Sequence, residues 1–304
     1  MLLKTVMIIR TILLCLSFAC MVTSSLAQDT VGQETSTLAF VDAHVHLNNP
    51  DMQLGLIEEY NLSKAIVFWG RDGDNETLME ATEAHPRRFI PFVSISPERS
   101  RYREYWQKED TTLLAELEAY LQTGLFKGIG EISVTHFPSR GFPEADFDPL
   151  GVMMKGIMRL AARYSVPVTI HCEVTRLTAF SELLNAFPQV TVIWAHGGYT
   201  PYFLAKRMIE RHPNLIYELS ARTYLNHPRS PDYTIFRNAN EIWPQWLDLI
   251  ERNPERFIVG TDASHRRLES ERYKIERVQL LLQQLTPETR RLVATENILQ
   301  LVGA

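Results

Sequence analysis

Six side chains that can bind a metal ion recur along the chain, each in or just after a short apolar segment. They are His44, His46, Glu131, His171, His196 and Asp262. Imidazole nitrogens and carboxylate oxygens suit zinc best, and manganese or iron is also compatible with such a mixed set. A divalent cation lowers the pKa of a bound water from 15.7 to about 7, which makes hydroxide available at neutral pH. The residue types therefore indicate a metal centre.

The first two histidines carry the most local information. His44 and His46 are one residue apart, so on a strand their side chains point to the same face and can share one ion. Asp42 precedes them by two, and we expect its carboxylate to orient one of the imidazoles. The pair alone is weak, because short matches arise by chance. Its strength comes from the other four side chains and their placement.

Eight short segments rich in Val, Ile and Phe are predicted to be strands. They are residues 39–46, 64–69, 89–94, 127–133, 167–173, 190–196, 215–219 and 256–262. They are nearly apolar throughout, as strands buried on both faces of a parallel sheet are. All six metal-binding side chains lie at or near their carboxyl ends. Helical periodicity is present in residues 111–122, 149–164, 176–187, 201–211, 241–251 and 286–302.

Strands that alternate with helices imply right-handed crossovers and parallel pairing. Eight repeats predict an α/β fold, a closed (β/α)8 TIM barrel, as a single domain over residues 38–304. In such a barrel the carboxyl ends of the strands converge, so the six side chains become neighbours. Segments 137–148 and 220–240 are long and lie on that side, which makes them candidate substrate loops.

Other polar residues follow strand ends and are candidates for contacting a substrate. They are Trp69, His136, Arg222 and His265. Arg222 could bind a substrate anion or form a structural salt bridge. His85, His212 and His227 each precede a proline in turn-like contexts, and we expect them to be solvated.

The N-terminal segment is predicted to be a secretory signal peptide over residues 1–27. Lys4 and Arg10 precede an apolar run at Thr11–Val22, too short to cross a bilayer comfortably. Small residues at Ser25 and Ala27 predict cleavage before Gln28, and hence export to the periplasm or secretion.

Cys20 permits a different interpretation of the same segment, as a lipoprotein anchor. Residues 28–37 are polar and predicted to be a flexible lead-in to the barrel. After cleavage Cys172 is the only cysteine left, so no internal disulfide can form.

Composition narrows the class of partner. The chain has 304 residues, of which 45% are hydrophobic and 22% charged, as in globular proteins. Its net charge is −5 and its basic residues are scattered, so a nucleic-acid partner is disfavoured and a small-molecule substrate is expected. Any exposed apolar helix face could be an interface, and the oligomeric state stays open.

The ordered set of motifs resembles the amidohydrolase superfamily of metal-dependent hydrolases, and specifically its amidohydrolase-related branch. The matching segments are Phe40–Leu47, Lys127–Ser133, Pro167–Cys172, Val192–Gly198, Phe257–Asp262 and Glu296–Val302. The resemblance covers essentially the whole chain after the signal peptide. It implies attack of hydroxide on an ester, lactone, amide or phosphoester of a small molecule.

The resemblance also implies roles for the six residues. His44 and His46 would bind the more buried metal together with Asp262, and Glu131 would bridge to a second metal held by His171 and His196. Asp262 would be the general base. Many members instead keep one metal, bound by the histidine pair, the fifth-strand histidine and the aspartate. His196 would then assist catalysis and Glu131 would be a spectator. We favour two metals.

Three other functions remain open. A metal-dependent decarboxylase of the same superfamily shares most of the metal set, but it typically has Glu before the histidine pair, where this chain has Asp42-Ala43. A TatD-like phosphodiesterase is compatible with the metal ligands, but a negative chain steers a phosphate backbone poorly. A non-catalytic exported binding protein would not need all six ligands.

Overall fold

The computed structural model describes residues 38–71, 73–97, 99–138, 144–223 and 234–304. The predicted signal peptide and lead-in lie outside the described residues, as do residues 139–143 and 224–233 of the two predicted substrate loops. The strands and helices all belong to the compact unit that begins at Thr37.

All eight predicted strands are present. They are β1 (Val41–Leu47), β2 (Lys64–Trp69), β3 (Phe89–Pro91), β4 (Ile129–His136), β6 (Val168–Cys172), β7 (Val192–Trp194), β8 (Leu215–Glu218) and β9 (Phe257–Ile258). Several are shorter than predicted, β9 most of all. A further strand, β5 (Ala145–Asp146), pairs antiparallel with β4 inside the segment predicted to be a loop.

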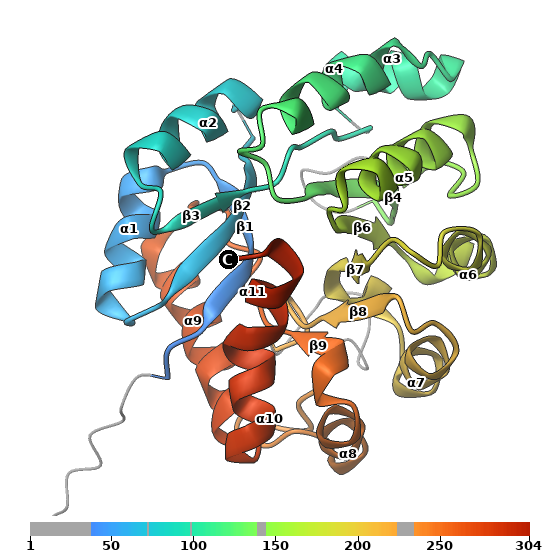
Figure 1. Ribbon diagram of the computed structural model, residues 1–304. Helices are drawn as coiled ribbons and strands as arrows, with labels where there is room; N and C mark the ends of the chain where they lie inside the picture. The colour runs from blue at the N-terminus through green and yellow to red at the C-terminus, as the bar shows by residue number, and fades with distance from the viewer. Residues whose placement is uncertain (1–37, 72, 98, 139–143, 224–233) are drawn as a thin grey trace, which may run out of the picture. The chain divides into compact units, whose positions relative to one another are not determined.

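The strands form two sheets whose edges also meet. Their orders are β1-β2-β3 and β5-β4-β6-β7-β8-β9, and every pair except β4–β5 is parallel. Figure 1 shows the labelled strands with the helices around them. Parallel bridges from Val93 to Ile129 and from Val45 to Ala263 join the sheets at both edges. This parallel α/β arrangement is consistent with the predicted TIM barrel.

Helices fill the connections between the strands. They are α1 (Pro50–Glu59), α2 (Asn75–Ala84), α3 (Ser100–Lys108), α4 (Thr112–Gln122), α5 (Val152–Tyr164), α6 (Leu177–Ala186), α7 (Tyr202–Arg211), α8 (Pro244–Arg252), α9 (Leu268–Gln283), α10 (Pro287–Arg291) and α11 (Asn297–Val302). The six predicted helical segments are confirmed. A π-helical turn, Leu292–Glu296, separates α10 from α11 in the last of them. Among the described residues, none of the helices combines the length and apolar character that a membrane span requires.

Buried apolar residues form two clusters. The larger lies between the strands and their covering helices. The smaller takes one face of the strands, with Val41, Phe68, Phe92 and Ile258 among its members, and it includes Ile298 of α11. Because side chains alternate along a strand, these residues fill the interior while their neighbours pack under the helices.

Two bulges set which side chains turn toward the interior. In β1 the register shifts between Asp42 and Val45, so Ala43 belongs to the interior cluster whereas Val45 packs under the helices. In β4 the register shifts between Ile129 and Ile132, which both pack under the helices. A bulge adds a residue and changes the facing of the residues after it. It thereby turns the site residues of β1 and β4 inward.

Candidate metal centre

The structure brings all six predicted metal-binding side chains together. His44 and His46 come from β1, Glu131 from β4 and His171 from β6. His196 lies two residues beyond β7 and Asp262 lies beyond β9, so both stand on turns rather than at the ends of strands as predicted. His46 and Asp262 have side chains 25% and 31% exposed, whereas the other four are buried. A substrate would therefore approach from the side of these two.

Glu131 lies at the middle of the cluster. Its Oε2 atom is 3.4 Å from His44 Nε2 and 3.2 Å from His46 Nε2. Its Oε1 atom is 3.0 Å from His171 Nδ1 and 3.6 Å from His196 Nε2. The two oxygens of one carboxylate thus face two separate pairs of histidines.

Asp262 closes the group around the first pair. Its Oδ1 atom lies 3.8 Å from His44 Nε2 and 3.6 Å from His46 Nε2, and the two Nε2 atoms are 3.4 Å apart. Ligand atoms about 2.1 Å from one tetrahedral zinc ion are separated by about 3.4 Å. The spacing of these donor atoms therefore fits a shared cation.

Three of the histidines have their outer nitrogen against an oxygen. His44 Nδ1 is 3.2 Å from a carboxylate oxygen of Glu218, and His46 Nδ1 is 3.4 Å from the carbonyl oxygen of Trp69. His196 Nδ1 is 2.7 Å from the hydroxyl oxygen of Ser220 and 3.3 Å from its carbonyl oxygen. These oxygens accept hydrogen bonds, so Nδ1 carries a proton in each ring, and in the neutral form of the ring the lone pair of Nε2 faces the cluster. Metal-binding histidines are oriented in this way.

The buried carboxylates favour positive charge within the cluster of histidines. Burial opposes charge on the His44 imidazole, but Glu131 and Glu218 outweigh it and raise its pKa well above the ordinary value. Burial likewise opposes charge on His171, yet hydrogen bonds to Glu131 and Glu173 raise its pKa to about 9. Burial would raise the pKa of Glu131. The charge of His44 and the hydrogen bonds that Glu131 forms with His171 and His196 outweigh burial and hold the pKa of Glu131 well below its usual range. Carboxylates that attract protons so strongly also attract a cation.

A left-handed turn of the backbone determines the direction of the His196 side chain. His196, Gly197 and Gly198 have φ values of 54°, 53° and 55°. A Cβ atom at Gly197 would lie 1.7 Å from the Tyr217 ring, so only glycine fits there. The Gly-Gly pair after the histidine is therefore needed for the sharp turn that follows β7.

Two buried carboxylates that contact the histidines were not among the predicted site residues. Glu218 ends β8 and contacts His44, and Glu173 follows β6 with its Oε1 atom 3.3 Å from His171 Nε2. Both are buried. The signal that could have found them is an acidic residue in each otherwise apolar predicted strand, because such a residue needs a buried partner.

Two of the predicted substrate residues lie next to the cluster. The ring of His136 is 4.9 Å from that of His171, and these two with Glu173 form a further group of possible donor atoms within 4.8 Å of one another. The carbonyl of Trp69 faces His46, while its indole stacks on Tyr102 at 5.4 Å.

The other two are held by the protein itself. Arg222 is buried, donates a hydrogen bond to the carbonyl of Thr200 and lies 5.3 Å from the Trp246 ring. His265 Nδ1 accepts from the Asn48 amide at 3.3 Å, and His265 Nε2 is 2.8 Å from Gln53 Oε1. Substrate contact by all four residues stays a prediction.

Two expectations were wrong. Asp42 does not orient an imidazole: it accepts hydrogen bonds from the amide and hydroxyl of Thr261 and from the amide of His44, so it fixes the backbone below the site. His212 is not solvated but buried, with Nε2 2.7 Å from the hydroxyl of Ser181. The proline after it marked a turn, and helix packing still covered the ring. His85 is half-buried, and His227 lies outside the described residues.

His265 should make the fold sensitive to acid. Burial is the main cause that lowers its pKa from 6.5 to about 4, so the folded chain holds it neutral. The stabilisation is complete above pH 6.5 and is lost as the pH falls from 6.5 toward about 4, because the unfolded chain binds the proton first. We expect a loss of up to about 3 kcal/mol in the free energy of unfolding over that range.

Denaturant unfolding of the wild type and of His265→Gln at pH 7 and pH 4.5 measures this difference. The variant should be less stable at pH 7 and should lose less stability on acidification. His85→Gln is the control, at a half-buried histidine of the α2 end. Equal acid losses in the wild type and His265→Gln would contradict the assignment.

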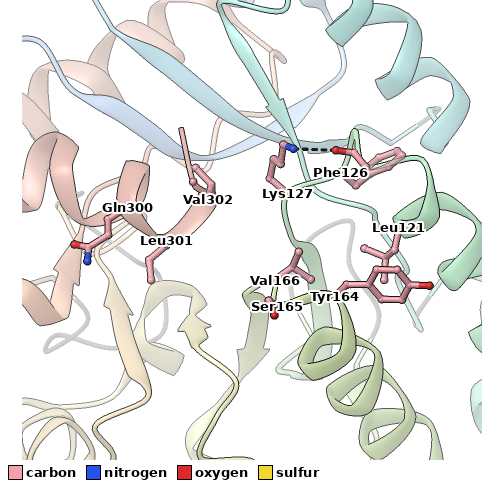
Figure 2. A pocket seen from close by; sticks show the side chains of 11 residues that line it. Leu121, Phe126, Lys127, Tyr164, Ser165, Val166, Gln300, Leu301 and Val302 are labelled. Atoms are coloured by element: carbon pink, nitrogen blue, oxygen red, sulfur yellow. Dashed lines mark hydrogen bonds between the residues drawn. The ribbon is translucent and has the colours of Figure 1, made fainter.

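A separate pocket opens at the other end of the strands. It has a volume of about 440 Å³ and is lined by residues before β4 and β6 and by the end of α11, including Phe126, Tyr164 and Leu301 (Figure 2). Lys127 is the charged residue of its described lining, and its ammonium group donates to the carbonyl of Gly124. This described lining has no imidazole or carboxylate, so the pocket does not carry the chemistry of the metal centre.

Solved structures share the fold at low sequence identity. An uncharacterized TIM-barrel protein from Bordetella bronchiseptica is 14% identical with a TM-score of 0.62, over 88% of this chain and 99% of its own. A 2,6-dihydroxybenzoate decarboxylase in complex with 2,6-dihydroxybenzoate is 12% identical with a TM-score of 0.57, and an amidohydrolase from Burkholderia multivorans with bound zinc is 12% identical with a TM-score of 0.53; each match covers 88% of this chain and 99% of the other.

Sequence comparison identifies the family. No curated protein matches the chain. The amidohydrolase family profile matches residues 41–304, a range that includes all the strands and the six predicted metal-binding side chains. The chain therefore belongs to the amidohydrolase family.

Proposed function

We propose that this chain is a metal-dependent hydrolase that cleaves an ester, lactone, amide or phosphoester of a small molecule. We further propose that it holds two divalent cations, with zinc the best match to the donors. The observation that carries the proposal is the position of Glu131, whose two carboxylate oxygens face different histidine pairs at 3.0–3.6 Å.

We propose two donor sets, of which the first, His44, His46 and Asp262, has its donor atoms within 4.8 Å of one another. His44, His46 and Asp262 would hold one cation, and His171 with His196 would hold the other, with one oxygen of Glu131 contributing to each. The amidohydrolase from Burkholderia multivorans with bound zinc supports a metal of this kind. When bound, a divalent cation lowers the pKa of water from 15.7 to about 7 and polarises the bond to be cleaved.

Asp262 is positioned to move the proton. Burial would raise its pKa, but His196, His44 and Lys274 outweigh burial and lower it, so the carboxylate is ionised at neutral pH. Its side chain is also partly exposed, so its oxygen can reach a water and a substrate. We propose that Asp262 accepts the proton of the attacking water and returns it to the leaving group. His196 would take over the stabilisation of negative charge if only one cation binds.

Metal removal and return tests the proposal. Chelator-treated protein should lose hydrolysis of a panel of esters, lactones, amides and phosphoesters, and zinc should restore it with about two equivalents per chain by elemental analysis. Manganese and iron are compared in parallel. A metal-replete protein that hydrolyses nothing but releases CO₂ from aromatic acids would support the decarboxylase instead. One that does neither would support a binding protein.

Export is a proposal of its own. We propose that the chain is exported, to the periplasm or the medium, after cleavage before Gln28. Cell fractionation and the N-terminal sequence of the processed protein test it. A lipid-modified N-terminus at Cys20 would support the lipoprotein anchor, and a full-length protein in the cytosol would contradict export.

A further inference from the structure

We propose that Glu218 is a positioning residue that orients two metal-binding histidines at once, His44 directly and His196 through Ser220, and so couples the two cation positions. The inference rests on the proposed two-cation centre. Glu218 itself touches neither cation position: it acts through the imidazoles on which its hydrogen bonds converge.

The hydrogen bonds of Glu218 fix its carboxylate. The Oε2 atom accepts from His44 Nδ1 at 3.2 Å, from the Ser220 hydroxyl at 2.6 Å and from the His196 amide at 3.2 Å. The Oε1 atom accepts from the Ser220 amide at 2.5 Å. The side chain is fully buried, so water does not compete for these bonds. Four donors on a buried carboxylate leave it one orientation.

Ser220 links the carboxylate of Glu218 to His196. Its hydroxyl has one proton, which goes to Glu218, and its oxygen lone pairs can still accept. His196 Nδ1 lies 2.7 Å from that oxygen. The chain of bonds therefore runs from His196 to Ser220 to Glu218, and it meets the bond from His44 at the same Oε2 atom. Both imidazoles are thereby held with Nε2 toward Glu131.

Packing brings His44 and His196 close to each other and to Glu218. The rings of His44 and His196 stack with centroids 4.9 Å apart. Opposite them, a Cβ atom on Gly260 would lie 2.8 Å from Glu218 Oε1 and 2.9 Å from both the Cβ and the amide nitrogen of His44. Because only glycine leaves this space, no side chain separates the carboxylate from His44.

Glu173 provides an internal comparison. It is also a buried carboxylate, and its Oε1 atom contacts the ring of one histidine of the cluster, His171, while its other oxygen accepts from the Phe137 amide at 2.8 Å. Glu173 therefore orients one ligand of one cation position. Glu218 differs in reaching ligands of both.

Zinc titration against a competing chelator separates these roles. The full chain is compared with Glu218→Gln, Ser220→Ala and Glu173→Gln. Loss of an outer partner typically weakens metal binding about 10–100-fold. We expect Glu218→Gln to weaken both zinc equivalents by this factor, and Ser220→Ala and Glu173→Gln to weaken one equivalent each. If Glu218→Gln weakens the binding of only one zinc equivalent, or of neither, the coupling is overturned. It is also overturned if Ser220→Ala weakens the binding of both zinc equivalents equally.

Histidine nitrogen NMR gives a readout that does not require zinc. With ¹⁵N-labelled histidine, Glu218→Gln should shift the Nδ1 resonances of His44 and His196 and leave those of His171, and Glu173→Gln should do the reverse. Ser220→Ala should shift His196 and leave His44. If Glu218→Gln does not fold, this last pattern decides the question.

The two proposals fail in different ways. A wild-type chain with one zinc equivalent, or none, contradicts the two-cation centre, and the histidine spectra then decide the role of Glu218. Spectra in which Glu218→Gln shifts only one of its two histidines overturn the inference even when two equivalents bind.

Discussion

Asp262→Asn should lower kcat by about 10²–10⁴-fold while leaving the fold intact, because the amide cannot accept the proton that the carboxylate takes. The residue has φ 52°, a left-handed conformation that asparagine tolerates better than most residues. Its carbonyl oxygen accepts a hydrogen bond of 2.7 Å from the Lys274 ammonium, which the substitution keeps. Steady-state kinetics on a substrate found in the hydrolysis panel, with the melting temperature in parallel, measures the effect.

The control is Asp248→Asn, at an exposed carboxylate of α8 paired with Arg252. It should keep full activity. Zinc content is measured for both variants, because Asp262 is also a predicted ligand. Wild-type turnover in Asp262→Asn would remove the general-base assignment, and a loss of activity explained wholly by lost zinc would reduce Asp262 to a ligand.

Glu131→Gln should reduce the zinc content from about two equivalents per chain to about one. A glutamine side chain offers one oxygen, so it cannot face both histidine pairs as the carboxylate does. The activity at saturating zinc should fall on the order of 10²–10³-fold, because a group that stabilises developing negative charge is lost with the second cation. Elemental analysis after dialysis and kinetics at added zinc provide the two measurements.

Glu251→Gln serves as the comparison, since this half-buried carboxylate binds Thr286 and Thr289 away from the centre. About one equivalent in both the wild type and Glu131→Gln would make Glu131 a spectator and favour the one-metal alternative. No zinc in either protein would contradict the metal centre altogether.

Most of the strands and helices were predictable because the sequence patterns that indicate them are local. An apolar segment such as 64–69 is a strand whatever surrounds it, and its bounds agree with β2. A histidine pair at spacing two points to one side of a strand. Helical periodicity predicted α4–α8 to within a few residues. The short strands β7 and β9 were overestimated because apolar residues continue past the last strand pairing, into turns that the ring of strands requires.

The direction in which the side chains of the site residues point depends on contacts between segments that are far apart in the sequence. The bulge in β1 shifts the register between Asp42 and Val45, where β1 pairs with β2 and, through Val45, with Ala263 after β9. The same sequence without those neighbours has no reason to bulge. This is why Asp42 was wrongly expected to orient an imidazole, and why its carboxylate instead holds Thr261, 219 residues away.

The sequence by itself determined the chemistry available: which donors exist, and that parallel strands of a repeating α/β fold would carry them to one end. The tertiary structure alone decided which atom of each donor faces the centre. His44 presents Nε2 because its Nδ1 meets Glu218, 174 residues later, whereas His171 presents Nδ1 because Glu173 lies against its Nε2. A ring nitrogen has no preference of its own strong enough to choose, so the buried acceptor beside it makes the choice.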